Sequence, residues 1–343
     1  MTHRSTGSAP DAVTAFSSRK GDAHMTNPTL GATGITVGDI TIGTSALGEG
    51  TTPGSPEEAQ AVAAAQALLA GPFPLLDTSN NYGNGRSETV LGLALADMGS
   101  RATARIATKV DRDGETGAFD RDRVLRSYEE SLTRLGLDRV GILHFHDPYS
   151  VTFAEATGPG GALEGLRELR DAGAVDAIGI AAGPIPLMTR YVETGLFDVV
   201  LSHNRYTLVD RSAEPLFAAA RERGMGVFNA APFGAGILAK GSASRASYGY
   251  VEAPPELMAW IARAEQLCAD HGVPLAAAAL HFSLRSPLVD STIVGIASTQ
   301  RLEQLQQLRE TVVPDALWSD LDALGSAPSP LPEQDAADSR PLL

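Results

Sequence analysis

The chain has 343 residues, of which 43% are hydrophobic and 20% are charged, so it can build a sizeable core. Its 27 Lys and Arg residues against 41 Asp and Glu residues give a formal net charge of −14. This excess of negative charge argues against nucleic acid or an anionic membrane as a partner, because both would repel it. No apolar run is close to the length of about 20 residues that spans a bilayer. The single cysteine, Cys268, excludes an intramolecular disulfide and the thiolate clusters of structural metal sites, and it fits a cytoplasmic location.

The two ends of the chain differ in composition from the middle. Residues 1–28 are rich in Ser, Thr, Ala and Gly and lack the hydrophobic run of a secretory signal, and Met25 lies directly before the first strand-like material. We expect residues 1–28 to form a disordered leader, of which residues 1–24 are a candidate over-extended start. Residues 326–343 contain four prolines among acidic and small residues and are expected to form a flexible tail.

Between these ends, short apolar runs that finish in polar residues alternate with longer helical segments. Eight runs are predicted to be strands: Ile40–Thr44, Phe73–Asp77, Arg105–Lys109, Val140–His146, Ala177–Ala181, Val199–Ser202, Gly226–Asn229 and Ser291–Val294. Helices are predicted over residues 55–70, 120–135, 163–172, 215–223 and 299–310. The first begins with an N-cap serine, a proline and two acids, and the next three are each followed closely by a glycine stop signal.

The alternation of strands and helices predicts an α/β fold with a parallel sheet and the helices outside it. Eight such units over residues 29–325 favour a (β/α)₈ TIM barrel, which typically takes about 250 residues. A doubly wound sheet would want a glycine-rich phosphate loop after its first strand, and residues 43–48 match G-x-G-x-x-G poorly. Before the first barrel strand, residues 29–42 are expected to form a β-hairpin that turns at Thr33-Gly34 or at Gly38-Asp39.

Polar residues at the strand ends predict the chemistry, because catalytic groups of such barrels lie where strands end. Asp77, Lys109 and His146 end three of the strands, and Tyr82 follows Asp77 in the next loop. A nearby ammonium favours the phenolate form of a tyrosine, a buried carboxylate keeps the ammonium charged, and an imidazole can orient a substrate oxygen. This set can move a proton on or off a carbonyl or hydroxyl oxygen. His144 is expected to be a barrel-interior or hydrogen-bonded residue instead.

Three motifs at these strand ends resemble those of the aldo-keto reductases. Residues 75–83 read LLDTSNNYG and are followed by Ser87-Glu88, residues 107–110 read ATKV, and residues 140–148 read VGILHFHDP. Their order and spacing agree with the family from about residue 29 to residue 308. The resemblance implies a TIM barrel without a Rossmann domain, a nicotinamide cofactor and no catalytic metal. It also implies a catalytic tetrad of Asp77, Tyr82, Lys109 and His146 in which Tyr82 is the general acid–base.

The same resemblance implies positions that contact the cofactor: Thr44, His203, Asn204, Asn229, Pro232, Gly234, Gly236, Gly295, Ser298 and Arg301. Residues 202–206, SHNRY, are similar to a segment whose glutamine binds the nicotinamide carboxamide, and here His203 has that place. Residues 229–238, NAAPFGAGIL, resemble the loop that covers the pyrophosphate. Ala181 and Ala182 stand where the family usually has Ser-Asn, so that contact to the carboxamide is missing or replaced.

The choice between NAD and NADP is predicted from charge. Members of the family that use NADP tend to place Lys or Arg early in the loop that receives the adenosine phosphate, where this chain has Gly295 and Ala297. Arg301 is the cation that remains, beside a helix N-terminus with weak anion affinity. We therefore expect NAD, with NADP possible because one arginine can hold a 2′-phosphate. The run Asp111-Arg112-Asp113 is read as a solvated loop.

The segment 229–238 resembles the branch of bacterial aldose 1-dehydrogenases, acting on L-fucose or D-threo-aldoses, and of plant L-galactose dehydrogenases. This implies oxidation of a sugar hemiacetal at C1 to a lactone. Alternatives within the family are a pyridoxal 4-dehydrogenase and a general aldehyde or ketone reductase. A nicotinamide-binding subunit without catalysis is an alternative of another class, and a barrel hydrolase or metal enzyme would need more clustered ligands. The physiological direction and the oligomeric state stay open.

Overall fold

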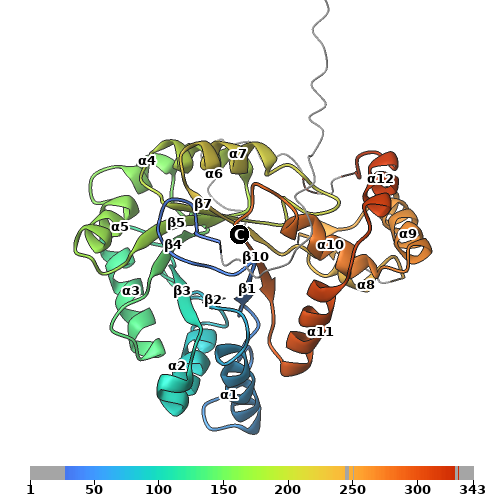
Figure 1. Cartoon of the computed structure of the whole chain (residues 1–343). Helices are drawn as coiled ribbons and strands as arrows, with labels where there is room; N and C mark the ends of the chain where they lie inside the picture. The colour runs from blue at the N-terminus through green and yellow to red at the C-terminus, as the bar shows by residue number, and fades with distance from the viewer. Residues whose placement is uncertain (1–27, 244–246, 250, 329–330, 332–343) are drawn as a thin grey trace, which may run out of the picture.

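The computed structural model describes residues 28–243, 247–249, 251–328 and 331. The expected leader and most of the expected C-terminal tail therefore lie outside the described residues. Eight parallel strands close into a barrel, as predicted, and their order around it is β1-β10-β7-β6-β5-β4-β3-β2 (Figure 1). These strands are β1 (Ile40–Gly43), β2 (Leu75–Asp77), β3 (Arg105–Val110), β4 (Ile142–His146), β5 (Ala177–Ala182), β6 (Val199–His203), β7 (Gly226–Ala230) and β10 (Ser291–Gly295).

Helices surround the strands on the outside of the barrel (Figure 1). They are α1 (Pro56–Leu69), α2 (Arg86–Met98), α3 (Arg121–Leu135), α4 (Phe153–Thr157), α5 (Ala162–Asp171), α6 (Ile185–Glu193), α7 (Glu214–Glu222), α8 (Ile237–Lys240), α9 (Pro255–Asp270), α10 (Leu275–Leu284), α11 (Thr299–Glu310) and α12 (Asp315–Ala323). Local signals explain their ends: the Ser55 and Asp120 side chains accept hydrogen bonds from first-turn amides, and Gly136 ends α3 in the left-handed conformation. Two elements are small, the 3₁₀ turn η1 (Gly99–Arg101) and the hairpin of β8 (Ser247–Tyr248) and β9 (Val251–Glu252).

The chain before β1 closes the N-terminal end of the barrel. The expected hairpin is reduced to one antiparallel bridge, between Thr29 and Thr36. Leu30 is fully buried and packs with residues inside the barrel, so this segment is a plug with a tight turn rather than a two-stranded ribbon. The plug fits because Gly31 has a positive φ and lies against Gly226, where a Cβ atom would come within 2.3 Å of a backbone nitrogen.

Strand parity decides which side chains enter the barrel. Leu75, Ala107, Ile142 and Leu201 form part of a buried cluster inside the barrel. Side chains two residues apart on a strand point to the same face of the sheet. The barrel interior is therefore also the side that receives Asp77, Lys109, His144, His146 and His203. The inward residues at the carboxyl ends of β2, β3, β4 and β6 are therefore titratable. None of the described helices is long and apolar enough to cross a membrane.

Candidate active site

A buried ion pair joins the ends of β2 and β3. The Lys109 ammonium lies 2.6 Å from Asp77 Oδ2 and also donates to the carbonyl oxygen of Thr78 at 2.6 Å. Lys109 is 1% exposed and Asp77 is 4% exposed. Burial is the largest single influence and opposes the charged form of the lysine, but Asp77 and Tyr82 together outweigh burial and raise the pKa of Lys109 above its ordinary value. The ammonium is therefore charged and fixed in position.

Tyr82 lies directly beside this ammonium, which is 4.5 Å from the centroid of its ring. The Lys109 charge and its hydrogen bond to the phenol lower the pKa of Tyr82, as the sequence predicts. Burial acts in the opposite direction and is the larger effect, so the pKa of Tyr82 is raised to about 12. The expectation of a phenol made more acidic than ordinary tyrosine is thus wrong for the protein without its ligands, because the ammonium offsets only part of the cost of burying a phenolate.

His146 completes the predicted group of four. Its ring meets the ring of Tyr82 edge-on, with 5.7 Å between centroids. Its Nδ1 lies 2.7 Å from Asp111 Oδ1 and 3.1 Å from the hydroxyl of Ser79. Burial disfavours the imidazolium, but the carboxylates of Asp111 and Asp147 outweigh burial and raise the pKa of His146. The structure therefore brings all four predicted catalytic side chains together.

Asp111 is a buried residue beside His146 that the sequence did not single out as part of the site. The run that contains it was expected to be a solvated loop, yet Asp111 is 5% exposed and its carboxylate accepts hydrogen bonds from Ser79, from the backbone N–H of Asn81 and from His146. The available signal was its position, two residues after Lys109 and hence on the same inward parity at the end of β3. Asp113 behaves as expected: its carboxylate accepts hydrogen bonds from the backbone N–H groups of Glu115 and Thr116 in its own loop.

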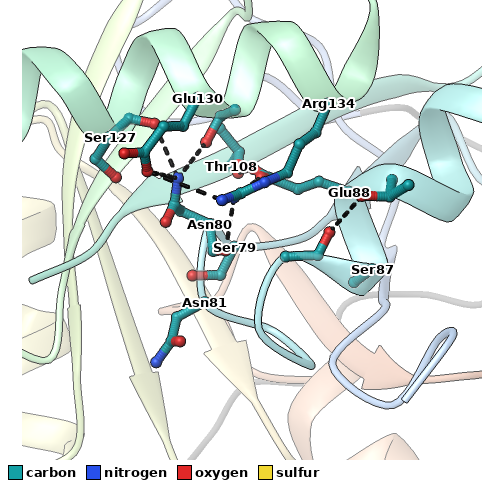
Figure 2. Close-up of polar contacts among 12 residues, drawn as sticks. Ser79, Asn80, Asn81, Ser87, Glu88, Thr108, Ser127, Glu130 and Arg134 are labelled. Carbon is teal, nitrogen blue, oxygen red and sulfur yellow. Dashed lines mark hydrogen bonds and ion pairs between the residues drawn. The ribbon is translucent and has the colours of Figure 1, made fainter. Parts of the chain in front are cut away.

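A second buried network holds the loop that carries Tyr82. Figure 2 shows side chains from α2, β3 and α3 that converge on this loop. Arg134 donates to the carbonyl oxygen of Asn80 at 2.9 Å and to Glu88 at 3.0 Å, while Thr108 donates to the other oxygen of Glu88 at 2.6 Å. The Asn80 side chain in turn donates to the carbonyl oxygen of Ser127 at 3.0 Å. The loop is therefore held to α3 through Asn80, and α3 is joined through Glu88 to α2 and β3.

His144 has the interior position expected for it. It is fully buried, and its ring meets Phe228 edge-on. Neither ring nitrogen has a hydrogen-bond partner among the described residues. Burial and the Lys109 charge hold the pKa of His144 well below its usual range, so the ring is neutral. Gly179 on the neighbouring strand makes room for it, because a Cβ atom there would lie 2.2 Å from His144 Nδ1.

The predicted cofactor residues lie on the other side of the barrel mouth. They follow or end β6, β7, β10 and β1, which are neighbours in the closed sheet. The tetrad comes from β2, β3 and β4, which form the adjoining arc. The described residues contain no group of three His, Cys, Asp or Glu that could hold a metal ion.

Asn204 and Asn229 each have a buried side-chain oxygen without a partner in the described chain, but their amide groups make different contacts. Asn204 is buried in a left-handed backbone conformation, its amide contacts His203 Nδ1 at 3.2 Å, and its Oδ1 has no partner in the described chain. Asn229 instead donates to Ser283 on α10 and to the carbonyl oxygen of Tyr206, so it braces the wall of the barrel. Thr44 donates to the carbonyl oxygen of Asp77.

The predicted cofactor residues after β7 and β10 lie at glycine turns and at the start of a helix. Gly234 has a positive φ and faces the ring of Tyr248, whose nearest carbon would lie 2.4 Å from an added Cβ atom. Gly236 caps α8 with a positive φ, and Pro232 precedes both. After β10, which ends at Gly295, Ser298 caps α11 by accepting from the backbone N–H of Arg301, whose side chain is exposed. The orphaned Asn204 oxygen and this cationic helix start fit a nicotinamide dinucleotide.

Comparison with known proteins gives concordant results. Residues 39–326 match the model of the aldo/keto reductase family. The chain is 32% identical over 333 residues to pyridoxal 4-dehydrogenase of Microbacterium luteolum, covering 86% of this chain and 96% of that protein. It is 31% identical to D-threo-aldose 1-dehydrogenase of a Pseudomonas species (89% and 99% covered) and 31% identical to L-galactose dehydrogenase of Arabidopsis thaliana (80% and 85% covered). An aldo-keto reductase of Bacillus halodurans, solved in its holo form, shares the fold with a TM-score of 0.69 at 22% identity, covering 89% of this chain and 98% of that one.

Proposed function

Because the chain belongs to the aldo/keto reductase family and is an oxidoreductase, we propose that it oxidises a sugar hemiacetal at C1 to a lactone with NAD. The observation that carries this proposal is the placement of the Lys109 ammonium between the Asp77 carboxylate and the Tyr82 ring, with His146 at the same barrel mouth. The similarity to D-threo-aldose 1-dehydrogenase and L-galactose dehydrogenase supports a sugar as the substrate. A cytoplasmic location is part of the proposal.

In this proposal the protein controls one proton and the orientation of one oxygen. A bound nicotinamide would supply the acceptor for the hydride that leaves the substrate carbon. Tyr82 takes the proton of the substrate hydroxyl after losing its own, and the Lys109 ammonium offsets part of the cost of burying the phenolate that this requires. His146 binds the same oxygen from the other side. Asn204 would hold the carboxamide of the cofactor, and Arg301 with the start of α11 would hold the adenosine phosphate.

Asp147 supports a polyhydroxylated substrate. It directly follows His146, has a positive φ, and its Oδ2 lies 3.7 Å from His146 Nε2. Its side chain is 40% exposed, so a carboxylate is available beside the oxygen-binding nitrogen. Carboxylates accept hydrogen bonds from neighbouring hydroxyl groups. The same carboxylate can pair with a protonated pyridine ring, so pyridoxal is the second candidate, supported by the 32% identity to pyridoxal 4-dehydrogenase.

A substrate panel tests the proposal. We expect formation of reduced cofactor, followed by its near-ultraviolet absorbance, with L-fucose, L-galactose or a D-threo-aldose, and none with simple alcohols. The Tyr82→Phe protein serves as the background control. Turnover of pyridoxal alone would select the second candidate. If the protein bound the cofactor tightly but turned over no sugar, pyridoxal or aldehyde, the proposed catalytic activity would be contradicted. That result would favour a nicotinamide-binding regulatory subunit.

Cofactor preference is a separate expected outcome. We expect a higher kcat/KM with NAD than with NADP, because Gly295 and Ala297 give a 2′-phosphate no charge partner. Replacement of Arg301 by alanine should weaken the residual use of NADP more than the use of NAD, since only the former has the extra phosphate. The measurement is kcat/KM for both cofactors in both proteins. A large preference for NADP in the unmodified enzyme would overturn the assignment.

A further inference from the structure

We propose that Asp111 is a positioning residue that keeps a proton on Nδ1 of His146. The other ring nitrogen, Nε2, which faces the substrate, then carries a proton only when the imidazole is charged. The inference concerns an interaction inside the protein, and its catalytic consequence rests on the proposed function. It extends the group of four side chains by a carboxylate that does not touch the substrate.

The contacts of the Asp111 carboxylate require it to accept a hydrogen bond from Nδ1 of His146. Oδ2 accepts from the backbone N–H of Asn81 at 3.0 Å and from the hydroxyl of Ser79, and Oδ1 lies 2.7 Å from His146 Nδ1. An ionised carboxylate can only accept, so Nδ1 of His146 must donate. The backbone of Asp111 is fixed as well, because its N–H donates to Ser127 and its carbonyl oxygen accepts from Arg123 at 2.8 Å. The carboxylate therefore cannot turn away from the imidazole.

The other ring nitrogen of His146 then has two distinct states. With Nδ1 protonated, a neutral imidazole presents a lone pair at Nε2, which repels the lone pairs of a carbonyl oxygen. The imidazolium presents an N–H at Nε2 and can donate to that oxygen as negative charge develops on it. Asp111 thus makes donation to the substrate depend on a second proton, as a carboxylate that orients a catalytic histidine does in general.

The surrounding charges favour that second proton. Titratable groups face His146 from four strands and the loops that follow them: Asp77 and Tyr82 from β2, Lys109 and Asp111 from β3, His144 and Asp147 from β4, and His203 from β6. Burial and the Lys109 ammonium oppose protonation, whereas Asp111 and Asp147 favour it and outweigh them, which raises the pKa. The imidazolium is accordingly retained to a higher pH than an ordinary histidine would allow.

Histidine NMR on the full-length protein tests the tautomer without any turnover. We expect the ¹⁵N shifts of His146, assigned by their loss in His146→Asn, to show titration above the ordinary range and a neutral form protonated at Nδ1. In Asp111→Asn the amide oxygen must still accept from Asn81, so the amide NH₂ faces His146 and forces the neutral Nε2–H form. Asp113→Asn, the same change on the same loop, should leave His146 unaltered.

Kinetics give the second readout. With an aromatic aldehyde and reduced cofactor, we expect kcat/KM of the unmodified enzyme to fall as the pH rises through the His146 pKa. In Asp111→Asn that fall should disappear and the plateau should drop by about 10-fold or more, in line with loss of an orienting partner. A merely structural Asp111 would lower activity at every pH and leave the fall in place, which would overturn the proposal.

The two readouts separate the tautomer from the proposed function. If His146 in the unmodified protein is protonated at Nε2 when neutral, the proposal is wrong whether or not the variant folds. If the NMR result is as expected and no substrate turns over, the assignment of Asp111 stands and the proposed function fails.

Discussion

Replacing Tyr82 with phenylalanine is expected to lower kcat by about 10²- to 10⁴-fold, the usual contribution of a positioned acid–base group. The phenol is the group that exchanges a proton with the substrate, and phenylalanine keeps the ring that packs beside Lys109 and His146 while removing only the hydroxyl. Because Lys109 stays paired with Asp77, the fold should be unaffected. The measurement is kcat for oxidation of the best sugar, together with the Kd of the cofactor, which should change little.

A matched variant sharpens this expectation. Tyr149 lies on the loop after β4, and its hydroxyl accepts a hydrogen bond from the backbone N–H of Gly183. Tyr149→Phe therefore removes the same group from the same barrel mouth and should lose far less turnover than Tyr82→Phe. Equal losses in the two proteins would show that removal of any phenol disturbs the mouth, and normal activity in Tyr82→Phe would assign the proton to another residue.

Strand ends were the part of the site most open to prediction from sequence. The carboxyl ends of parallel strands meet on one rim, so Asp77, Lys109 and His146 could be placed together before any coordinates were known. The parity of each strand also fixed His144 inside the barrel. These predictions depend on local pattern and on a topology that permits few alternatives.

Long-range effects on a group's environment could not be predicted in the same way. Asp111 lies in a run of charged residues that is typical of a solvated loop, and only the tertiary structure shows Ser79 and Asn81 donating to it. Likewise the presence of Lys109 predicts an acidic Tyr82, but the net direction depends on how deeply the phenol is buried, which raises its pKa to about 12. The charged partners of a titratable group are therefore easier to predict from a sequence than the degree to which the group is buried from solvent.

Asn229 illustrates a related limit. Its place in the loop motif implied a cofactor contact, but strand parity directs its side chain outward to Ser283 and the carbonyl oxygen of Tyr206. Ala230, the next residue, has the inward position and packs against the interior cluster. A residue can therefore belong to a family motif because it supports the wall of the binding site, and not only because it contacts the ligand.

Replacing Lys109 with methionine is expected to abolish activity and to lower the free energy of unfolding by about 3–5 kcal/mol near neutral pH, the usual cost of leaving one member of a buried ion pair alone. Methionine fills the same space, so the loss is one of charge and not of packing. Asp77 would then be a buried carboxylate without its ammonium, and one of its oxygens already lacks a partner in the described chain. The measurement is urea denaturation of both proteins.

The pH dependence of this loss identifies its cause. Burial already raises the pKa of Asp77 beside Lys109, and because the ammonium opposes that rise, removing the ammonium raises this pKa further. The folded variant therefore takes up a proton more readily than the unfolded chain does. Its stability relative to the unmodified protein should therefore recover as the pH is lowered through that pKa.

The double variant Asp77→Asn, Lys109→Met removes both charges and should regain most of the stability at neutral pH while staying inactive. If the double variant were as unstable as Lys109→Met, the pair would not be the source of the loss, and activity in either protein would refute the role of Lys109 in stabilising the Tyr82 phenolate.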